Sequence, residues 1–275
     1  MNILNIGTEE LLSQNNIKVH IFENSEFMFY TMASEMADVI RRNNTLNKPT
    51  VMIFPVGPVG QYPYFVDIIN RESISMRNTI IINMDEYAES PDKLVDITHP
   101  LSFRGFMQRE VYSKINEELL PLPENRIFPS IENLDEIPNI IGKMGGVDAC
   151  FGGIGINGHV AFNEPPEQGD ALDDDTAFIN STVRIQKIAL HTQIVNSISD
   201  LFGAYDQMPR YCITIGMKQI LQSRKIRLYC AKQWHSAVVR KAVFEKKSRH
   251  FPVTLLRDHP DISIGLPSNI ADLHF

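Results

Sequence analysis

The chain alternates between short apolar runs and longer amphipathic stretches. Apolar or β-branched runs of strand length occur at 17–22, 51–54, 79–82, 147–151, 183–190, 211–215 and 226–230. Apolar residues at helical spacing indicate helices near 26–42, 62–70, 102–119, 133–144, 193–202 and 235–245. The last part of the chain, 253–256 and 262–264, predicts a strand pair or a loop followed by a strand.

This order of elements predicts an α/β fold. Strands that alternate with helices at such spacing indicate βαβ crossovers and a mostly parallel, doubly wound sheet with helices on both faces. The sequence shows no repeat, low-complexity segment or break in composition, so we expect one domain over 1–275. Ligands of such sheets bind beyond the carboxyl ends of strands, which draws attention to the residues after Phe54, Ile82 and Phe151.

Composition and charge narrow the classes of partner. The formal net charge is −7 and the pI is near 5.6, so the chain lacks the basic footprint of a nucleic-acid-binding protein. The cysteines Cys150, Cys212 and Cys230 lie in apolar stretches and predict buried thiols in a reducing compartment. With neither a signal-peptide pattern nor an apolar stretch long enough to span a bilayer, we expect a cytoplasmic protein without a membrane partner. A homo-oligomer is compatible with the sequence.

A glycine-rich segment follows the strand at 147–151. Gly153, Gly155 and Gly158 fit the pattern GxGxxG, which in dinucleotide-binding proteins opens a helix. Here the two prolines at 165–166 stop any helix soon afterwards. We therefore predict no nucleotide cofactor, and expect the glycines to let the backbone pass close to a small ligand.

The same segment carries groups that could move a proton. His159 and Glu164 are five residues apart, and the amide of Asn157 is nearby. A carboxylate can fix the tautomer of an imidazole and raise its basicity, which makes the imidazole a competent proton carrier near neutral pH. The alternative is that these side chains only tie the loop together by hydrogen bonds.

Two adjacent acids follow the strand at 79–82. Asp85 should lie nearer the crevice, while Glu86 points the other way if the chain stays extended. One of them could instead cap the next helix or remain solvated. HExxH, HxH, paired CxxC and GxSxG patterns are all missing, so we predict neither a metal site nor a serine hydrolase.

Three motifs together resemble the glucosamine-6-phosphate deaminase/isomerase family. They are NMDEY at 83–87, HPLSF at 99–103 and GGIGINGHVAFNEP at 152–165, with weaker matches at 208–216 and 253–260. The related 6-phosphogluconolactonases share the family's fold but match these motifs less well. The resemblance implies a Rossmann-like sheet, a sugar-phosphate substrate, and aldose–ketose isomerisation coupled to loss of ammonia.

The resemblance also implies roles for individual residues. Asp85 matches the general base that moves a proton between C2 and C1 through an enediol or enolamine. His159 matches the histidine that assists opening of the pyranose ring, and Glu164 matches the carboxylate that supports it. Asn157 stands where deaminases of the family usually carry aspartate, and it can orient His159 but cannot stabilise an imidazolium by charge.

The anion-binding side departs from the family pattern. The loop 56–61 with Gly57 and Gly60 replaces the usual phosphate cradle, and Pro58 removes one backbone donor. Ile198 falls at the position of the family's arginine. The family's lysine corresponds either to Lys232 or, in an alignment without gaps, to His235. Glu86, Gly153, Gly155, Gly158 and Lys232 complete the predicted substrate-binding set.

Three functional hypotheses follow. The first is an isomerase/deaminase that acts on an amino-sugar phosphate such as glucosamine 6-phosphate. The second is an isomerase, or a hydrolase of lactones, that acts on a different sugar. The third is a catalytically silent sugar-binding regulator. The residues Asp85, His159 and Glu164 favour the enzymes, whereas the changed anion loop favours a changed ligand.

Overall fold

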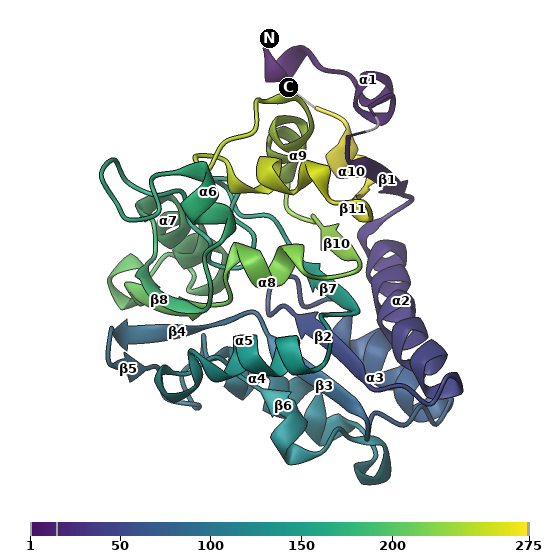
Figure 1. Ribbon diagram of the computed structural model, residues 1–275. Coiled ribbons are helices and arrows are strands. Elements are labelled where there is room, and N and C mark those ends of the chain that lie inside the picture. Colours follow the sequence, from purple (N-terminus) through teal and green to yellow (C-terminus); the bar gives the residue numbers. More distant parts are fainter. Residues whose placement is uncertain (1, 15, 274–275) are drawn as a thin grey trace.

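A seven-stranded, entirely parallel sheet forms the centre of the molecule (Figure 1). The computed structural model describes residues 2–14 and 16–273. The strand order is β1-β11-β10-β7-β2-β3-β6. The strands are β1 (Lys18–Phe22), β2 (Thr50–Phe54), β3 (Thr79–Asn83), β6 (Arg126–Ile127), β7 (Ala149–Gly152), β10 (Ile226–Tyr229) and β11 (Ile262–Pro267). The predicted α/β fold with a parallel sheet is confirmed.

Apolar side chains leave this sheet on both faces, which explains the continuous apolar runs in the sequence. The helices are α1 (Thr8–Leu12), α2 (Ser25–Thr45), α3 (Tyr62–Arg71), α4 (Phe103–Glu110), α5 (Glu136–Lys143), α6 (Asp175–Ile179), α7 (Leu190–Asp200), α8 (Met217–Leu221), α9 (His235–Phe244) and α10 (Ser268–Ala271). In β2, Met52 and Phe54 join a cluster with α2 and α3, while Val51 and Ile53 join a second cluster with α5, α8 and α9. Within the described ranges, none of the helices is both long and apolar enough to cross a membrane.

A second, antiparallel sheet corrects one expectation. The segments at 183–190 and 211–215 do not join the parallel sheet: they form β8 (Arg184–Lys187) and β9 (Tyr211–Thr214) of a four-stranded sheet. Its other strands are β4 (Asp85–Ser90) and β5 (Lys93–Leu94), in the order β5-β4-β9-β8. Period and composition identify a strand but not its partners, so the sequence could not separate the two sheets.

The helix predicted over 102–119 is shorter than expected. α4 ends at Glu110, and short 3-10 turns follow at Tyr112–Lys114 and Glu117–Leu119. Asn70 of α3 accepts from the N–H of Asn116 (2.9 Å) and donates to the carbonyl of Lys114 (2.8 Å). These tertiary hydrogen bonds replace the helical ones, although the apolar spacing remains helical.

The strand considered at 253–256 is also wrong. Pro252–Asp258 is a 3-10 helix, and every residue from Pro252 to Leu256 is buried. A segment buried on all sides produces a continuous apolar run whatever its backbone conformation, so the run alone cannot distinguish a strand from a helical turn.

Candidate active site

Loops after β2, β3 and β7 meet at the carboxyl edge of the parallel sheet. Gly153 follows β7, and a Cβ atom there would lie 3.2 Å from the carbonyl oxygen of Gly57, in the loop after β2. Asp85 follows β3 after a single residue and begins β4. The three segments singled out in the sequence are therefore neighbours in the structure, as expected for an α/β sheet.

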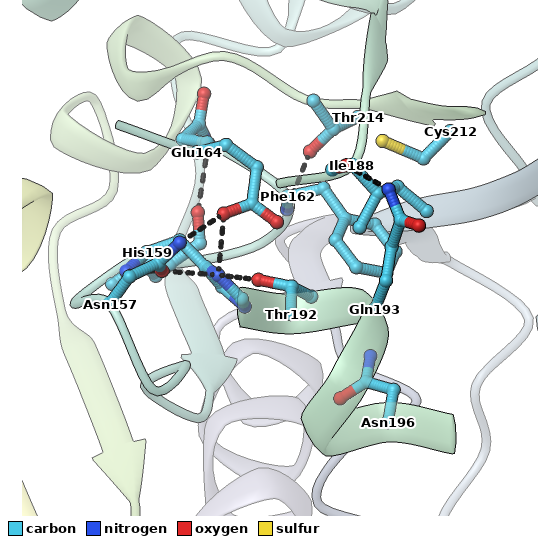
Figure 2. Close-up of polar contacts among 12 residues, drawn as sticks. Asn157, His159, Phe162, Glu164, Ile188, Thr192, Gln193, Asn196, Cys212 and Thr214 are labelled. Atoms are coloured by element: carbon cyan, nitrogen blue, oxygen red, sulfur yellow. Dashed lines mark hydrogen bonds and ion pairs between the residues drawn. The ribbon is translucent and has the colours of Figure 1, made fainter. Parts of the chain in front are cut away.

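The predicted polar residues of the glycine loop form one cluster (Figure 2). Nδ1 of His159 lies 2.9 Å from Oδ1 of Asn157 and 3.1 Å from Oε2 of Glu164. The amide nitrogen of Asn157 donates to the same Glu164 oxygen at 2.6 Å. The side chains of His159 and Glu164 are 13% and 5% exposed, so the pair is shielded from water.

The surroundings of Nδ1 fix the tautomer of His159. A third oxygen, Oγ1 of Thr192 on α7, lies 3.3 Å from Nδ1. Since the nearest groups are oxygen acceptors, the proton of the neutral ring belongs on Nδ1, and Nε2 is left to accept. Gly155 makes room for this ring, because a Cβ atom at residue 155 would lie 2.0 Å from a ring carbon of His159.

The charge on Glu164 is stabilised within the cluster. Burial opposes ionisation of this carboxyl, but the His159 imidazole, the Asn157 amide and the Thr192 hydroxyl together lower its pKa. Its other oxygen, Oε1, is buried and has no hydrogen-bond partner among the described residues. Glu164 therefore stays ionised while one buried acceptor remains open.

Asp85 lies in a dry environment. The residue is 7% exposed and pairs across the antiparallel sheet with Thr214 of β9. Burial, followed by the nearby Glu86 carboxylate, raises its pKa well above the usual range, and the backbone N–H of Phe162 offsets part of this effect. A carboxylate of this kind is more basic than one in water, which suits proton abstraction from carbon.

Phe162 connects the two halves of the candidate site. Its backbone N–H donates to Oγ1 of Thr214 (3.0 Å) and also interacts with Asp85. Its ring centroid lies 5.9 Å from that of His159 and 5.2 Å from that of Tyr87. The segment 157–164 thus positions both the imidazole cluster and the environment of Asp85.

Glu86 faces away from Asp85, as the extended backbone predicts. Its carboxylate accepts from the Ser102 hydroxyl (3.1 Å) and from the N–H groups of Phe103 (2.9 Å) and Arg104 (2.8 Å), at the start of α4. The capping alternative considered from the sequence is the arrangement that the structure contains. The Glu86 carboxylate is therefore occupied at the start of α4, and its role in substrate binding stays a prediction.

The glycines of the predicted binding set serve different ends. A Cβ atom at Gly60 would meet the ring of Phe29 at 2.4 Å, and one at Gly158 would meet that of Phe251 at 2.7 Å. Gly158 has φ +83° and Gly57 has φ +135°, a region that side chains other than glycine rarely adopt. Gly57 has open space where a side chain would be, so among these three it is the glycine that leaves room for a ligand.

His235 is a structural residue. Its Nδ1 accepts from the backbone N–H of Lys232 (2.8 Å), so Nε2 carries the proton toward the carbonyl of Ile154 (2.9 Å). Burial lowers its pKa to about 4, so the ring is neutral near pH 7 and cannot replace a cationic lysine. Lys232 is exposed beyond β10 and remains the candidate cation.

The contacts of Thr192 and His235 could not be predicted from the sequence, in which His235 stands out only as the residue at the position of the family's lysine. Thr192 is 1% exposed on α7 and reaches His159 from 33 residues away, and His235 anchors the glycine loop from 81 residues away. No local pattern marks either contact. Within the described residues, no group of histidine, cysteine and acidic side chains could hold a metal ion.

Solved structures define the class of fold. A monomeric glucosamine-6-phosphate deaminase superposes with a TM-score of 0.78 at 24% identity, covering 93% of this chain and 99% of that one. The 6-phosphogluconolactonase from Trypanosoma cruzi superposes with a TM-score of 0.64 at 13% identity, covering 93% and 96%. The chain thus has the Rossmann-like fold found in these deaminases and lactonases.

Sequence comparison finds glucosamine-6-phosphate deaminases that align with most of the chain. The glucosamine-6-phosphate deaminase of Clostridium perfringens (strain 13 / Type A) is 28% identical over 265 residues, covering 94% of this chain and 99% of that protein. The deaminase of Thermoanaerobacter pseudethanolicus is 27% identical over 247 residues, covering 88% and 90%. No family model matches the chain. The resemblance predicted from the motifs is confirmed: the chain is similar to glucosamine-6-phosphate deaminases over most of its length.

Proposed function

We propose that the protein is an aldose–ketose isomerase/deaminase that acts on an amino-sugar phosphate of the glucosamine 6-phosphate type. The observation that carries this proposal is the buried cluster of Asn157, His159 and Glu164 close to a dry carboxylate, Asp85. The curated relatives support it, since they are named for this activity. The proposed working unit is a single domain in the cytoplasm that needs no cofactor.

In the proposed reaction, His159 first opens the sugar ring. Its free Nε2 takes the proton of the O1 hydroxyl and returns a proton to the ring oxygen as the C1–O5 bond breaks. Glu164, held by Asn157, stabilises the imidazolium that forms in between. The open-chain aldehyde is the species on which isomerisation can begin.

Asp85 then moves the carbon-bound proton. It removes the proton from C2 while the carbonyl oxygen at C1 takes up a proton from solvent, which gives the enolamine. Asp85 then delivers its proton to C1 as the 2-amino group releases one proton to solvent and becomes an imine. Addition of water to C2 of the imine, followed by loss of ammonia, gives the ketose phosphate. Positioned proton transfer of this kind contributes roughly 100- to 10,000-fold to a rate.

The test is ammonia release from glucosamine 6-phosphate, with exchange of the C2 proton measured in deuterated water. We expect both activities in the wild-type protein, and a loss of roughly 100- to 10,000-fold in Asp85→Asn. Deuterium incorporation at the wild-type rate in that variant would remove Asp85 from the mechanism. Exchange without ammonia release would favour an isomerase for a different sugar.

The residues at the predicted phosphate-binding positions support a second candidate function. The 56–61 loop contains Pro58, Ile198 is 67% exposed where the family has arginine, and His235 is neutral. These features favour a sugar with a weaker or differently placed anionic group, for an isomerase or a lactonase of the same fold. A sugar-binding regulator without catalysis would bind such a ligand and show neither exchange nor ammonia release.

A further inference from the structure

A cavity of about 400 Å³ lies on the side of β4 opposite to Asp85. Glu86, β6, the segment that follows β6, and the first residues of α4 and α5 line it. Neither Asp85 nor any member of the His159 cluster belongs to its lining. Its size falls at the lower end of the range typical of small-molecule sites.

Two arginines lie in this cavity without a carboxylate partner. Arg104 and Arg126 are both half-buried, and neither takes part in an ion pair within residues 2–14 and 16–273. Nε of Arg104 is buried and has no acceptor among the described residues. Arg126 is held in place by two hydrogen bonds to the carbonyl of Pro121 (3.0 and 2.8 Å) and by the ring of Tyr112.

The carboxylates of the cavity do not neutralise these arginines. Glu86 is already hydrogen-bonded to the start of α4. The remaining acids, Glu124, Glu132 and Glu136, are exposed at the rim. The pKa of Glu132 is lowered first by the Ser130 hydroxyl, with the charge of Arg104 as the last of several causes, and the Glu132 and Arg104 side chains form no ion pair within the described residues. A buried N–H donor of a charged guanidinium, such as Nε of Arg104, destabilises the fold unless an acceptor hydrogen-bonds to it.

We propose that this cavity is a second ligand site, which binds a small molecule with an anionic group at one end and an amino group at the other. The anionic group, a phosphate or a carboxylate, would bind between Arg104 and Arg126. The amino group would then lie near the solvated carboxylates of the rim. This site is independent of the activity proposed above.

Arginine side-chain signals test the site directly. Inorganic phosphate is titrated into the full-length ¹⁵N-labelled protein, and the Nε–Hε resonances of Arg104 and Arg126 are followed by NMR. We expect the Arg104 signal to shift and saturate. In calorimetry, Arg104→Gln and Arg126→Gln should each weaken phosphate binding at this site at least tenfold, whereas Arg42→Gln, on the exposed face of α2, should not.

Phosphoethanolamine serves as the second probe. It should bind more tightly than inorganic phosphate, and Glu132→Gln should reduce this advantage. An Arg104 resonance that does not respond to phosphate would overturn the proposal, even if an arginine variant failed to fold. Equal affinity for phosphate and phosphoethanolamine would overturn the proposal that the rim carboxylates bind the amino group of the ligand. Arg104→Gln should release ammonia at the wild-type rate. The NMR and calorimetric tests need no turnover, so they decide this proposal even if the protein proves to have no deaminase activity.

Discussion

Asp85 illustrates how one residue can serve catalysis at the expense of stability. Its carboxyl is buried and its pKa is raised, so the folded protein holds this proton more tightly than the unfolded chain, where aspartate titrates near about 3.9. As pH rises from about 4 toward the folded pKa, the folded state must give up a proton that it binds preferentially. Stability therefore falls across this window and stays level above it.

Replacing Asp85 by asparagine should relieve this cost. We expect Asp85→Asn to raise the free energy of unfolding at pH 7 by roughly 1–3 kcal/mol, the usual range for a poorly compensated buried polar group. Well below about pH 4 the two proteins should have similar stability, because the aspartate is then protonated in both states. Urea unfolding at both pH values measures the difference, and a variant that is less stable at pH 7 would contradict this account.

Asn157 limits the charge near His159. Asn157→Asp would replace the donor that now reaches Glu164 at 2.6 Å by a second carboxylate, and both acids would face the imidazole. Extra negative charge favours the imidazolium, so the titration midpoint of His159 should rise. NMR of the ring protons across pH follows this midpoint in both proteins. The matched control, Asn180→Asp at the exposed residue that follows α6, should leave it unchanged.

At this scale, the sequence reveals the site where its members are close along the chain. Asn157, His159 and Glu164 lie within one short loop, and the structure brings them together as a cluster. The opposite directions of Asp85 and Glu86 follow from strand alternation alone. Thr192 could not be found in this way, because its contact with His159 depends on how α7 packs.

Most strands of the parallel sheet could be predicted from the sequence, although the short edge strand β6 was not. β2, β3 and β7 are buried on both faces, so their composition alone identifies them. The end of α4 depends instead on hydrogen bonds from Asn70 of another helix, which no local pattern encodes. Strand partners in the antiparallel sheet are equally nonlocal.

α7 has an inverted amphipathic pattern. Its buried residues are polar, namely Thr192, Gln193 and Ser197, whereas Ile194 and Ile198 are 44% and 67% exposed. The polar face is buried because its side chains have polar partners: Thr192 reaches His159 in the candidate site, and Gln193 donates to the carbonyl of Ile188, just before α7, at 2.5 Å. The helical spacing of its apolar residues therefore predicts the helix, but it does not predict which face of the helix is buried.

Ile198 on α7 allows a test of whether this helix contributes to phosphate binding. Ile198→Arg introduces the arginine that the motif resemblance implies at this position, and a charge-assisted hydrogen bond to phosphate is worth about 1.5–3 kcal/mol. We expect KM for glucosamine 6-phosphate to fall roughly tenfold or more, with a smaller effect on kcat. Leu190→Arg, two turns away on α7 and 57% exposed, is the control for added charge. An equal response of both variants would mean that residue 198 does not face the phosphate.

At the scale of the whole molecule, ligand binding and stability are linked. The parallel sheet carries one apolar cluster on each face, and the candidate site lies on loops at its carboxyl edge. Because these loops have their geometry only when the sheet is folded, a ligand bound there stabilises the folded state of the whole domain. The stabilisation is RT ln(1 + [L]/Kd), which makes thermal unfolding a measure of affinity. No turnover is needed, so the readout also applies to a sugar that is bound but not converted.

Glucosamine 6-phosphate should stabilise the protein only weakly. With a loop that contains Pro58, a neutral His235 and Lys232 as the candidate cation, we expect a dissociation constant near the millimolar range. At about 1 mM ligand, the gain would then be roughly 0.4 kcal/mol. For a chain of this size, each kcal/mol raises Tm by about 2–4 °C, so the shift should be near 1 °C. Micromolar binding would instead give about 4 kcal/mol and a shift of roughly 10 °C. Asp85→Asn, which should bind the sugar phosphate without converting it, is the variant in which to make the measurement.

A large rise in the Tm of Asp85→Asn with glucosamine 6-phosphate would show that other cations have rebuilt the phosphate site. Glucosamine 6-phosphate would then be the physiological substrate to pursue.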